Sequence, residues 1–343
     1  MKDLHSVESD HPVFIVGAPR SGTTLMAKVL NRHSRIFMPG ETHFFPDIYA
    51  QREELGSFSE EKTMSRVWGK LTTLYQRYNE PDDQARVDAI LEDRDAQEHL
   101  RTSMCSYREA LTAFMLVQTE REGKVRWGNN APKDLFYFED ILDFYPGAQF
   151  VVCVRDIRGF LKSYQDKWKA TADSQIGRLK KLYHPVITSL LWKSSVRRVE
   201  ALKRKFSGNG LLVVRYEDMV SQPEATIKGV CEYISEDFEP QMLDINFSNS
   251  SDRQAQTGIY SVSVDSWKKK LSLEDVWIAQ WLCGREMQLL GYEVKPVRPD
   301  KLRLMRVLLS TPWALARALR SNRANTGPIV PYIWRRISGL MGR

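Results

Sequence analysis

The sequence predicts an α/β fold in which a parallel sheet is flanked by helices. Short apolar runs bounded by turn residues recur along the chain, as at Val13–Val16, Phe150–Val154 and Leu211–Val214. Continuous apolar runs of this length are typical of strands that are buried on both faces. Segments with helical spacing of apolar residues lie between them, and strands that alternate with helices favour a parallel sheet covered on both sides.

The predicted elements follow each other in a regular order. A strand ending at Gly17 leads through a turn-rich loop to a helix, Thr24–Arg32, and a second short strand, Arg35–Met38, follows. Apolar residues at helical spacing predict further helices within residues 47–122 and at Asp134–Phe144, Ile157–Trp168, His184–Phe206, Pro223–Ile234 and Ser272–Leu290. Residues Leu243–Ser263 lack periodicity and are expected to form a long loop, which in a compact domain is more often functional than idle.

Charge divides the chain near residue 300. Residues 301–343 hold nine Lys or Arg and no Asp or Glu; because the whole chain carries +7, residues 1–300 carry about −2. We therefore predict one domain over residues 1–300 and a basic amphipathic extension over residues 301–343, with its helix interrupted at Pro312. The near-neutral body gives no support to nucleic-acid binding. The extension suits an anionic membrane surface, or equally an ordinary helix that packs on the body.

The sequence favours a cytoplasmic location. Its first residues are polar and acidic ahead of a short apolar run, unlike a signal peptide, and no stretch reaches the roughly 18 apolar residues of a membrane-spanning helix. The four cysteines show no C-x-x-C spacing, which argues against a disulfide framework and against a zinc site. We expect no bound metal.

The loop Gly17-Ala-Pro-Arg-Ser-Gly-Thr-Thr lies between a predicted strand and a predicted helix. Backbone N–H groups and the helix dipole converge in such a loop and form a site for anions. The spacing is that of a P-loop, G-x-x-x-x-G-K-[ST], except that Thr23 replaces the lysine. A nucleoside triphosphatase needs this lysine and a magnesium-binding acid at a later strand end, where this chain has Arg155. The pattern favours a P-loop-type fold whose cations hold a phosphate-rich nucleotide; a tight turn without ligand is the alternative.

Four motifs resemble those of sulfotransferases that use 3′-phosphoadenosine 5′-phosphosulfate (PAPS), and they follow the family's order. They are Pro19–Leu25, Phe150–Arg158 with Ser163, Leu212–Val220 with Pro223-Glu224, and Tyr260–Lys269. The motifs are similar to those of the branch that contains bacterial carbohydrate and lipid sulfotransferases and the tyrosylprotein enzymes. The resemblance implies a P-loop-type parallel sheet with helical insertions, and transfer of a sulfuryl group from PAPS to an acceptor hydroxyl, with PAP as the product.

The resemblance also implies a set of donor-binding residues. Those for the 5′-phosphosulfate are Arg20, Ser21, Gly22, Thr23, Thr24 and Leu25. The 3′-phosphate, which ATP lacks, would be held by the guanidinium fork of Arg155 and a hydrogen bond from Ser163 at a helix start. A salt bridge to a neighbouring carboxylate is the alternative for Arg155. Tyr260, Ser263 and Lys268 are expected to close over the nucleotide, although a solvated helix face explains the lysine equally well.

Sulfuryl transfer to an alcohol needs a proton acceptor and cations that stabilise the leaving group. Glu41 follows a predicted strand and resembles the glutamate that acts as general base in this branch; a surface turn glutamate is the alternative. His43 is the second candidate, because an unperturbed histidine pKa of about 6.5 suits a base near neutrality. Many relatives carry a lysine in a K-x-P stretch where this chain has Asn130. Either Lys133 from a shifted position or Arg20 alone is then expected to stabilise the leaving group.

These observations predict a PAPS-dependent sulfotransferase whose acceptor is a small molecule, most simply a carbohydrate or glycolipid, and which lies in the cytoplasm or at the inner membrane face. Two alternatives stay open. A P-loop small-molecule kinase is disfavoured by Thr23 and Arg155, and its preference for ATP over PAP would reveal it. A non-catalytic nucleotide- or membrane-binding scaffold is kept open by Asn130, and it would bind PAP without transferring sulfate.

Overall fold

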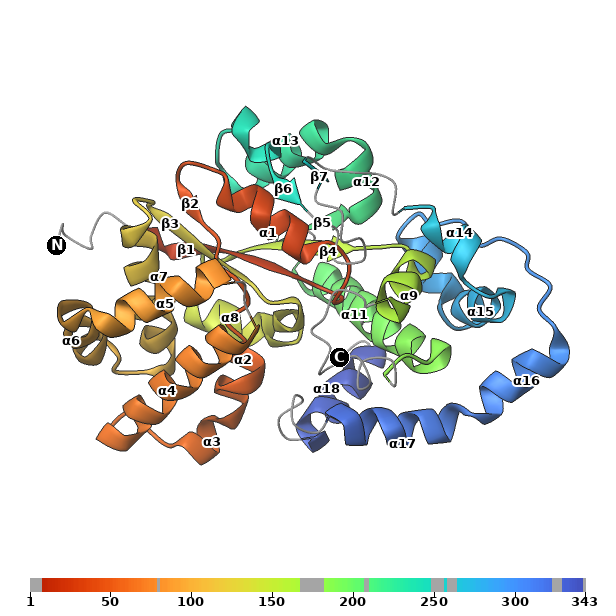
Figure 1. Cartoon of the computed structure of the whole chain (residues 1–343), viewed down its shortest axis with the longest axis horizontal. Helices are drawn as coiled ribbons and strands as arrows, with labels where there is room; N and C mark the ends of the chain where they lie inside the picture. The colour runs from red at the N-terminus through yellow and green to blue at the C-terminus, as the bar shows by residue number, and fades with distance from the viewer. Residues whose placement is uncertain are drawn as a thin grey trace. The chain divides into compact units, whose positions relative to one another are not determined.

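The computed structural model describes residues 8–78, 81–166, 182–206, 210–247, 256–257, 264–322 and 329–341 (Figure 1). The strands of its main sheet are β1 (Glu8–Gly17), β2 (Ile36–Phe37), β3 (Arg126–Asn130), β4 (Gln149–Val154) and β5 (Leu211–Arg215). They form a five-stranded parallel sheet in the order β2-β3-β1-β4-β5. The predicted α/β fold is confirmed.

Two compact units are interleaved along the chain. The first comprises Met1–Val16, Thr23–Val152 and Lys228–Leu243, and the second comprises Gly17–Gly22, Cys153–Ile227 and Asp244–Arg343. The phosphate-loop motif is shared between them, because its first six residues belong to the second unit and its two threonines to the first.

The first unit surrounds an aromatic core. The rings of Phe14 and Phe150 are stacked with centroids 5.6 Å apart, and Phe138 stacks on Phe150 at 4.0 Å. Its helices are α1 (Thr23–Asn31), α2 (Phe44–Asp47), α3 (Arg52–Leu55), α4 (Glu61–Tyr78), α5 (Pro81–Glu92), α6 (Arg94–Ser103), α7 (Tyr107–Arg121) and α8 (Phe138–Phe144), with 3-10 turns η2 (Tyr49–Gln51), η3 (Pro132–Tyr137) and η5 (Pro240–Leu243). The helices inserted within residues 47–122 are thus confirmed, and Figure 1 shows α4, α5 and α6 grouped together.

The second unit is organised around its longest helix, α11 (Pro185–Lys205), which buries Trp192 and packs against α15 and α18. The other elements are α9 (Ile157–Gln165), α12 (Tyr216–Ser221), the first turns of α13 (Pro223–Ile234), α14 (Ser266–Lys270), α15 (Leu273–Leu289), α16 (Lys301–Leu309), α17 (Thr311–Asn322), α18 (Ile329–Leu340) and the antiparallel pair β6 (Asn246–Phe247) and β7 (Gln256–Thr257). A loop was expected over residues 243–263. Within it, β6 and β7 form a short antiparallel pair that was not predicted. Residues 248–255 and 258–263 lie outside the described ranges.

Strand β3 is the strand of the main sheet that the sequence prediction omits. Its residues are Arg-Trp-Gly-Asn-Asn, with one large apolar side chain, yet all five are buried between β2 and β1. Gly128 makes this possible, because a Cβ there would lie 2.6 Å from the Val13 carbonyl oxygen. A further difference is that the helix expected over Asp134–Phe144 begins as the 3-10 turn η3 and becomes α-helical only at Phe138.

The C-terminal extension is interrupted where Pro312 predicts. Helix α16 ends at Leu309 and α17 begins at Thr311, so that the proline occupies the first turn, where its missing N–H costs nothing. The Asp300 side chain caps α16 by accepting a hydrogen bond from the Arg303 N–H at 2.8 Å. Helix α18 was not predicted. Among the described helices, none combines the length and apolar character that crossing a membrane requires.

Gly17 is expected to tolerate no side chain. Its φ is 147°, and a Cβ would lie 2.3 Å from the Cys153 carbonyl oxygen, so Gly17→Ala should lower the free energy of unfolding by more than about 2 kcal/mol. Gly69→Ala in α4 is the matched control, because no atom lies within 4 Å of its Cβ, and it should be neutral or stabilise by up to about 1 kcal/mol. Urea denaturation measures both, and equal midpoints would contradict this expectation.

Candidate active site

The loop that follows β1 has a tightly constrained backbone. Arg20 has a φ of 73°, in the left-handed region that non-glycine residues rarely adopt, and Gly22 has a φ of 97°. A Cβ on Gly22 would lie 2.7 Å from the Tyr216 ring, so only glycine fits. Ser21 is fully buried, and its hydroxyl has no hydrogen-bond partner within the described part of the chain. Strained backbone and an unsatisfied buried hydroxyl are both features of ligand-binding loops.

Two arginines and a serine lie together next to this loop. The Arg20 Nε donates to the Ser163 Oγ at 3.1 Å, and the Arg155 Nη1 donates to the Arg20 carbonyl oxygen at 3.4 Å. All three belong to the second unit, although 143 residues separate Arg20 from Ser163. Ser163 was expected at the start of a helix, but it lies in the second turn of α9. The predicted donor-binding residues Arg20, Arg155 and Ser163 are therefore brought together.

Arg155 is fixed from several sides. Its guanidinium stacks 4.2 Å from the centroid of the Tyr216 ring, and its backbone carbonyl accepts a hydrogen bond from the Trp192 indole at 2.9 Å. The neighbouring Asp156 carboxylate is engaged by Arg158, through contacts of 2.9 Å from Nε and 2.5 Å from Nη2. Tyr216 lies within the Leu212–Val220 motif, but the sequence prediction did not name it as a partner of Arg155.

The remaining predicted donor-binding residues differ in what they can offer. Thr23 is buried as the first residue of α1, Thr24 is exposed, and the side chain of Leu25 is packed in the interior, so that only its backbone is available to a ligand. The Lys268 ammonium pairs with the Asp265 carboxylate at 2.7 Å on an exposed helix, as the solvated-face alternative expects. Tyr260 and Ser263 lie outside the described residues.

The residues of this loop region fit a ligand with phosphate groups. The guanidinium groups of Arg20 and Arg155 provide positive charge, and the Ser21 hydroxyl can provide a hydrogen bond. Because Gly17 and Gly22 have no side chains, the backbone N–H groups of the loop are accessible to a ligand. PAPS, which the sequence predicts as donor, carries one phosphate and one phosphosulfate on the same adenosine. Arg20, Ser21, Arg155 and Ser163 are the residues that would hold these groups.

A polar cavity of about 240 Å³ lies within the first unit. Glu41, Asn130 and Thr24 line it together with the charged side chains of Lys28 and Arg86. The Asn130 side-chain oxygen is buried and has no hydrogen-bond partner among the described residues. The cavity therefore brings the predicted base and the asparagine that replaces the family lysine to one polar space.

His43 lies between two carboxylates. Its Nε2 is 3.3 Å from Glu41 Oε2, and its Nδ1 is 3.4 Å from Asp47 Oδ2. Burial, assisted by the positive charge of Lys133, lowers the pKa of His43 to about 3. The imidazole is therefore neutral near pH 7. His43 was considered as a base because an ordinary histidine pKa lies near neutrality, and with the lowered pKa it is too weak a proton acceptor for that role. A neutral ring instead donates one hydrogen bond and orients a carboxylate.

A buried chain of polar side chains supports the segment that carries Glu41. Asn129 Nδ2 donates to Asp134 Oδ2 at 2.8 Å, and the Thr42 hydroxyl donates to Asn129 Oδ1 at 3.1 Å. Burial, and next the negative charge of Glu41, raises the pKa of Asp134 well above its usual range, while Lys133 acts in the opposite direction. Glu41, His43 and Lys133 therefore share one electrostatic environment. Sequence reasoning missed Asn129 and Asp134, because nothing local marks them as partners.

Asp134→Asn is expected to flatten the pH dependence of stability. The raised pKa of Asp134 means that the folded chain keeps a proton that the unfolded chain loses near about pH 4. Between these two pKa values the folded state binds more protons, so the free energy of unfolding falls as pH rises, by at most about 1.4 kcal/mol per pH unit. Asparagine keeps an acceptor for Asn129 but does not titrate. Denaturation at several pH values should show the decline in the wild type and in Asp88→Asn, an exposed control, and a smaller decline in Asp134→Asn.

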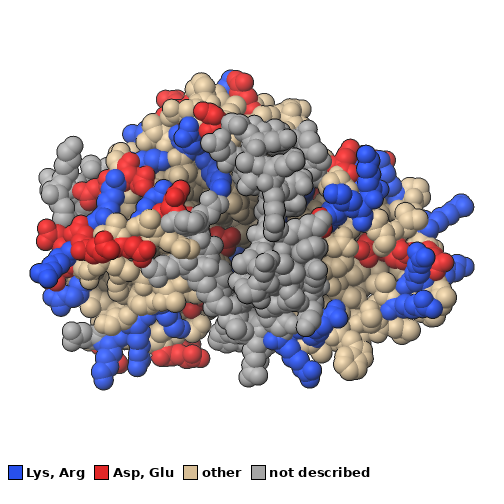
Figure 2. All heavy atoms as spheres, in the orientation of Figure 1, with Lys and Arg blue, Asp and Glu red and all other residues tan. Residues whose placement is uncertain are grey.

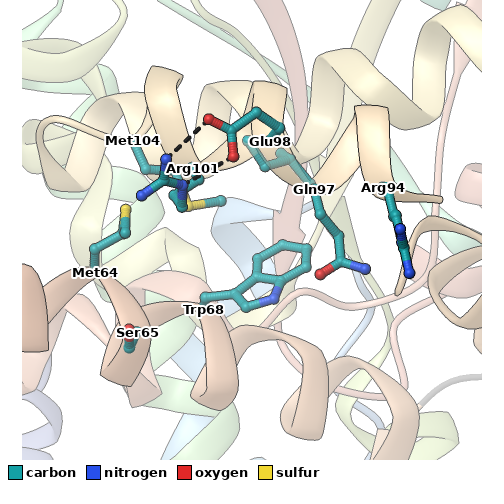
Figure 3. A pocket seen from close by; sticks show the side chains of 9 residues that line it. Met64, Ser65, Trp68, Arg94, Gln97, Glu98, Arg101 and Met104 are labelled. Carbon is teal, nitrogen blue, oxygen red and sulfur yellow. Dashed lines mark hydrogen bonds and ion pairs between the residues drawn. The ribbon is translucent and has the colours of Figure 1, made fainter. Parts of the chain in front are cut away.

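A second cavity, of about 380 Å³, lies between α4 and α6 (Figure 3). Trp68 and Gln97 project toward each other from the two helices, and Arg101 pairs with Glu98 at 2.9 Å on its rim. No predicted site residue lines this cavity. The described residues include no group of three or more His, Cys, Asp or Glu side chains that could hold a metal ion.

The parallel sheet and the glycine-bounded loop that follows β1 define an α/β protein with a P-loop-type fold. The chain belongs to the sulfotransferase family, whose sequence model matches residues 12–240, and it is a sulfotransferase. It is 22% identical to protein-tyrosine sulfotransferase A of Caenorhabditis elegans over 305 residues, which are 84% of this chain and 69% of the relative. It is also 22% identical to the nodulation protein NoeE of Sinorhizobium fredii over 306 residues, 82% of this chain and 65% of that protein.

The fold is also that of a solved sulfotransferase domain. The sulfotransferase domain of the olefin synthase from Synechococcus PCC 7002 superposes with a TM-score of 0.50 at 19% identity, covering 84% of this chain and 98% of that domain. The family implies PAPS as the sulfuryl donor. The identity of the acceptor does not follow from these relatives, because they differ in kind.

Proposed function

We propose that the chain transfers a sulfuryl group from PAPS to a hydroxyl of a carbohydrate or glycolipid, with Glu41 as the general base. The observation that carries the donor half is the arrangement of Arg20, Arg155 and Ser163 beside a strained, glycine-bounded loop. The acceptor half is supported by Glu41, which lines a polar cavity and is contacted by a neutral histidine. Membership of the sulfotransferase family makes this chemistry the one to expect.

The proposed reaction needs one proton transfer and one displacement at sulfur. Glu41 accepts the proton of the acceptor hydroxyl, whose oxygen forms the new bond to sulfur. The bond between sulfur and the bridging phosphate oxygen breaks, and PAP leaves with the electron pair. Arg20 and Lys133 supply positive charge for the leaving group, in place of the lysine that Asn130 replaces. His43 orients the Glu41 carboxylate and takes no proton in the reaction.

A carbohydrate or glycolipid acceptor is supported by the polarity of the Glu41 cavity. Lys28, Asn31 and Arg86 line it beside Asp82 and Asp83, so that its wall offers both hydrogen-bond donors and acceptors to a polyhydroxylated ligand. We place the enzyme in the cytoplasm, peripheral at the inner membrane face. A free, exposed thiol at Cys105 is in keeping with a reducing compartment.

Calorimetry with PAP and with ATP, followed by transfer of radiolabelled sulfur from PAPS, tests this function. We expect PAP to bind and ATP to bind at least about tenfold more weakly, because the 3′-phosphate contacts are lost. Labelled sulfur should then appear on sugars or glycolipids in an acceptor panel that includes tyrosine peptides. Preference for ATP would indicate the kinase alternative, PAP binding without any transfer would indicate the scaffold, and labelled peptides alone would overturn the proposed acceptor.

A further inference from the structure

Exposed apolar side chains are confined to the C-terminal part of the second unit. All twelve large hydrophobic side chains that are exposed in the described residues lie at or after Leu273, and none lies in the described residues before it. Isolated exposed apolar residues are normal on any protein surface. Such a concentration in one part of a chain is instead typical of an interaction surface.

Helix α16 presents an apolar stripe to solvent. Leu302, Met305 and Leu309 are 53%, 51% and 71% exposed, and their spacing of three and four residues places them on one face. Lys301 and Arg306 are exposed on either side of this stripe. The inward-facing residues of the same helix are also apolar and half-buried. A helix that only covered the body would not need a second apolar face.

Helix α17 continues this pattern with a tryptophan and two arginines. Trp313 is 80% exposed, and Arg317 and Arg320 follow it by four and seven residues on the same face. Ala314, which directly follows Trp313 and so points away from it, is buried. In Figure 2, cationic side chains project from the region where Figure 1 places α16 and α17. We name the outer faces of these two helices, formed by Leu302, Met305, Leu309, Trp313, Arg317 and Arg320, the docking face.

The docking face is held in place by contacts on the inner side of the extension. Ser310, between the two helices, is 3.1 Å from His184 Nε2, and α18 packs along α11. In α18, Arg336 Nη1 donates to the hydroxyls of Ser194 and Ser195, each at 3.2 Å. Helix α18 therefore attaches the end of the extension to α11, and the outer faces of α16 and α17 are exposed to solvent.

We propose that the docking face binds an anionic lipid surface. Trp313 and the apolar stripe of α16 would insert among the lipid headgroups, and the flanking cations would contact the lipid phosphates. A second copy of the chain is the competing occupant. However, residues 301–343 carry nine cations and no acid, so a symmetric contact of this face with itself would bring like charges together. The inference deepens the proposed function, because a surface-bound enzyme would meet a glycolipid acceptor, but binding itself requires no chemistry.

Co-sedimentation of the full chain with vesicles of phosphatidylcholine, with and without phosphatidylglycerol, tests the proposal. Binding is expected only when phosphatidylglycerol is present. Arg317→Gln/Arg320→Gln should weaken it about 30-fold, the effect of two cations near an anionic surface, and Leu309→Glu by at least about tenfold. Lys62→Gln/Arg66→Gln, which removes two exposed cations one turn apart in α4, is the matched control and should bind as the wild type does.

Retained PAP affinity in each variant shows that the fold is intact and separates a failure here from a failure of the donor assignment. Equal binding to both kinds of vesicle, or wild-type binding by Arg317→Gln/Arg320→Gln, would overturn the proposal. So would a dimer in light scattering without vesicles that Leu309→Glu converts to a monomer, because the docking face would then be covered by a second copy.

Discussion

Glu41→Gln is expected to reduce sulfuryl transfer at least about 100-fold while leaving PAP affinity within about twofold of the wild type. Glutamine keeps the size of the side chain and an oxygen that can accept a hydrogen bond from His43 Nε2, which is 3.3 Å from the Glu41 carboxylate. It removes only the capacity to take a proton. Single-turnover transfer of labelled sulfur measures the chemical step, and calorimetry measures PAP binding.

Asp47→Asn is the matched control for this variant. Asp47 lies 3.4 Å from the other nitrogen of His43, so the substitution removes one negative charge on the opposite side of the same ring. We expect it to retain most of the activity, because the proposal gives Asp47 no part in the proton transfer. If both variants lost the same amount of activity, the negative charge of the cluster would be what sulfuryl transfer requires, and not a base at Glu41. Wild-type turnover by Glu41→Gln would remove Glu41 from the mechanism.

The extent to which the fold is predictable depends on whether burial is visible in local sequence. Strands β1, β4 and β5 were predicted because apolar residues fill them, and the helices because their apolar residues recur with helical spacing. Strand β3 was not predicted, because its burial results from the strands on either side of it and not from apolar residues of its own. Its polar residue Asn129 is satisfied by Thr42 and Asp134, which no local pattern connects.

The candidate site shows the same division. Gly17 and Gly22 were identified because their spacing reflects the backbone conformation of the loop, and Arg20 was identified through the resemblance to sulfotransferases. The contact of Arg20 with Ser163 across 143 residues could not be predicted, because it depends on the tertiary fold. His43 shows a further limit: its unperturbed pKa suggests a base, whereas burial lowers the pKa to about 3, which local sequence does not reveal.

Arg155→Ala is expected to weaken PAP binding about 100-fold or more, the usual scale for truncating one partner of a buried charge pair. The guanidinium is buried, stacked on Tyr216 and fixed through its backbone by Trp192, so little reorganisation is needed to receive a phosphate. Arg155→Lys keeps the charge but loses the planar fork and the stacking on Tyr216, and we expect it to lose about tenfold. Calorimetry with PAP measures both.

The matched control is a change of ligand within the same variants. AMP lacks the 3′-phosphate, so a residue that binds this group should affect AMP far less than PAP. We expect the ratio of PAP to AMP affinity to fall about 100-fold in Arg155→Ala, whereas Lys268→Gln, whose ammonium is paired with Asp265, should leave it unchanged. If Arg155→Ala weakened both ligands equally, Arg155 would be a structural support of the loop through its contact with the Arg20 carbonyl, and the 3′-phosphate would have to be bound elsewhere.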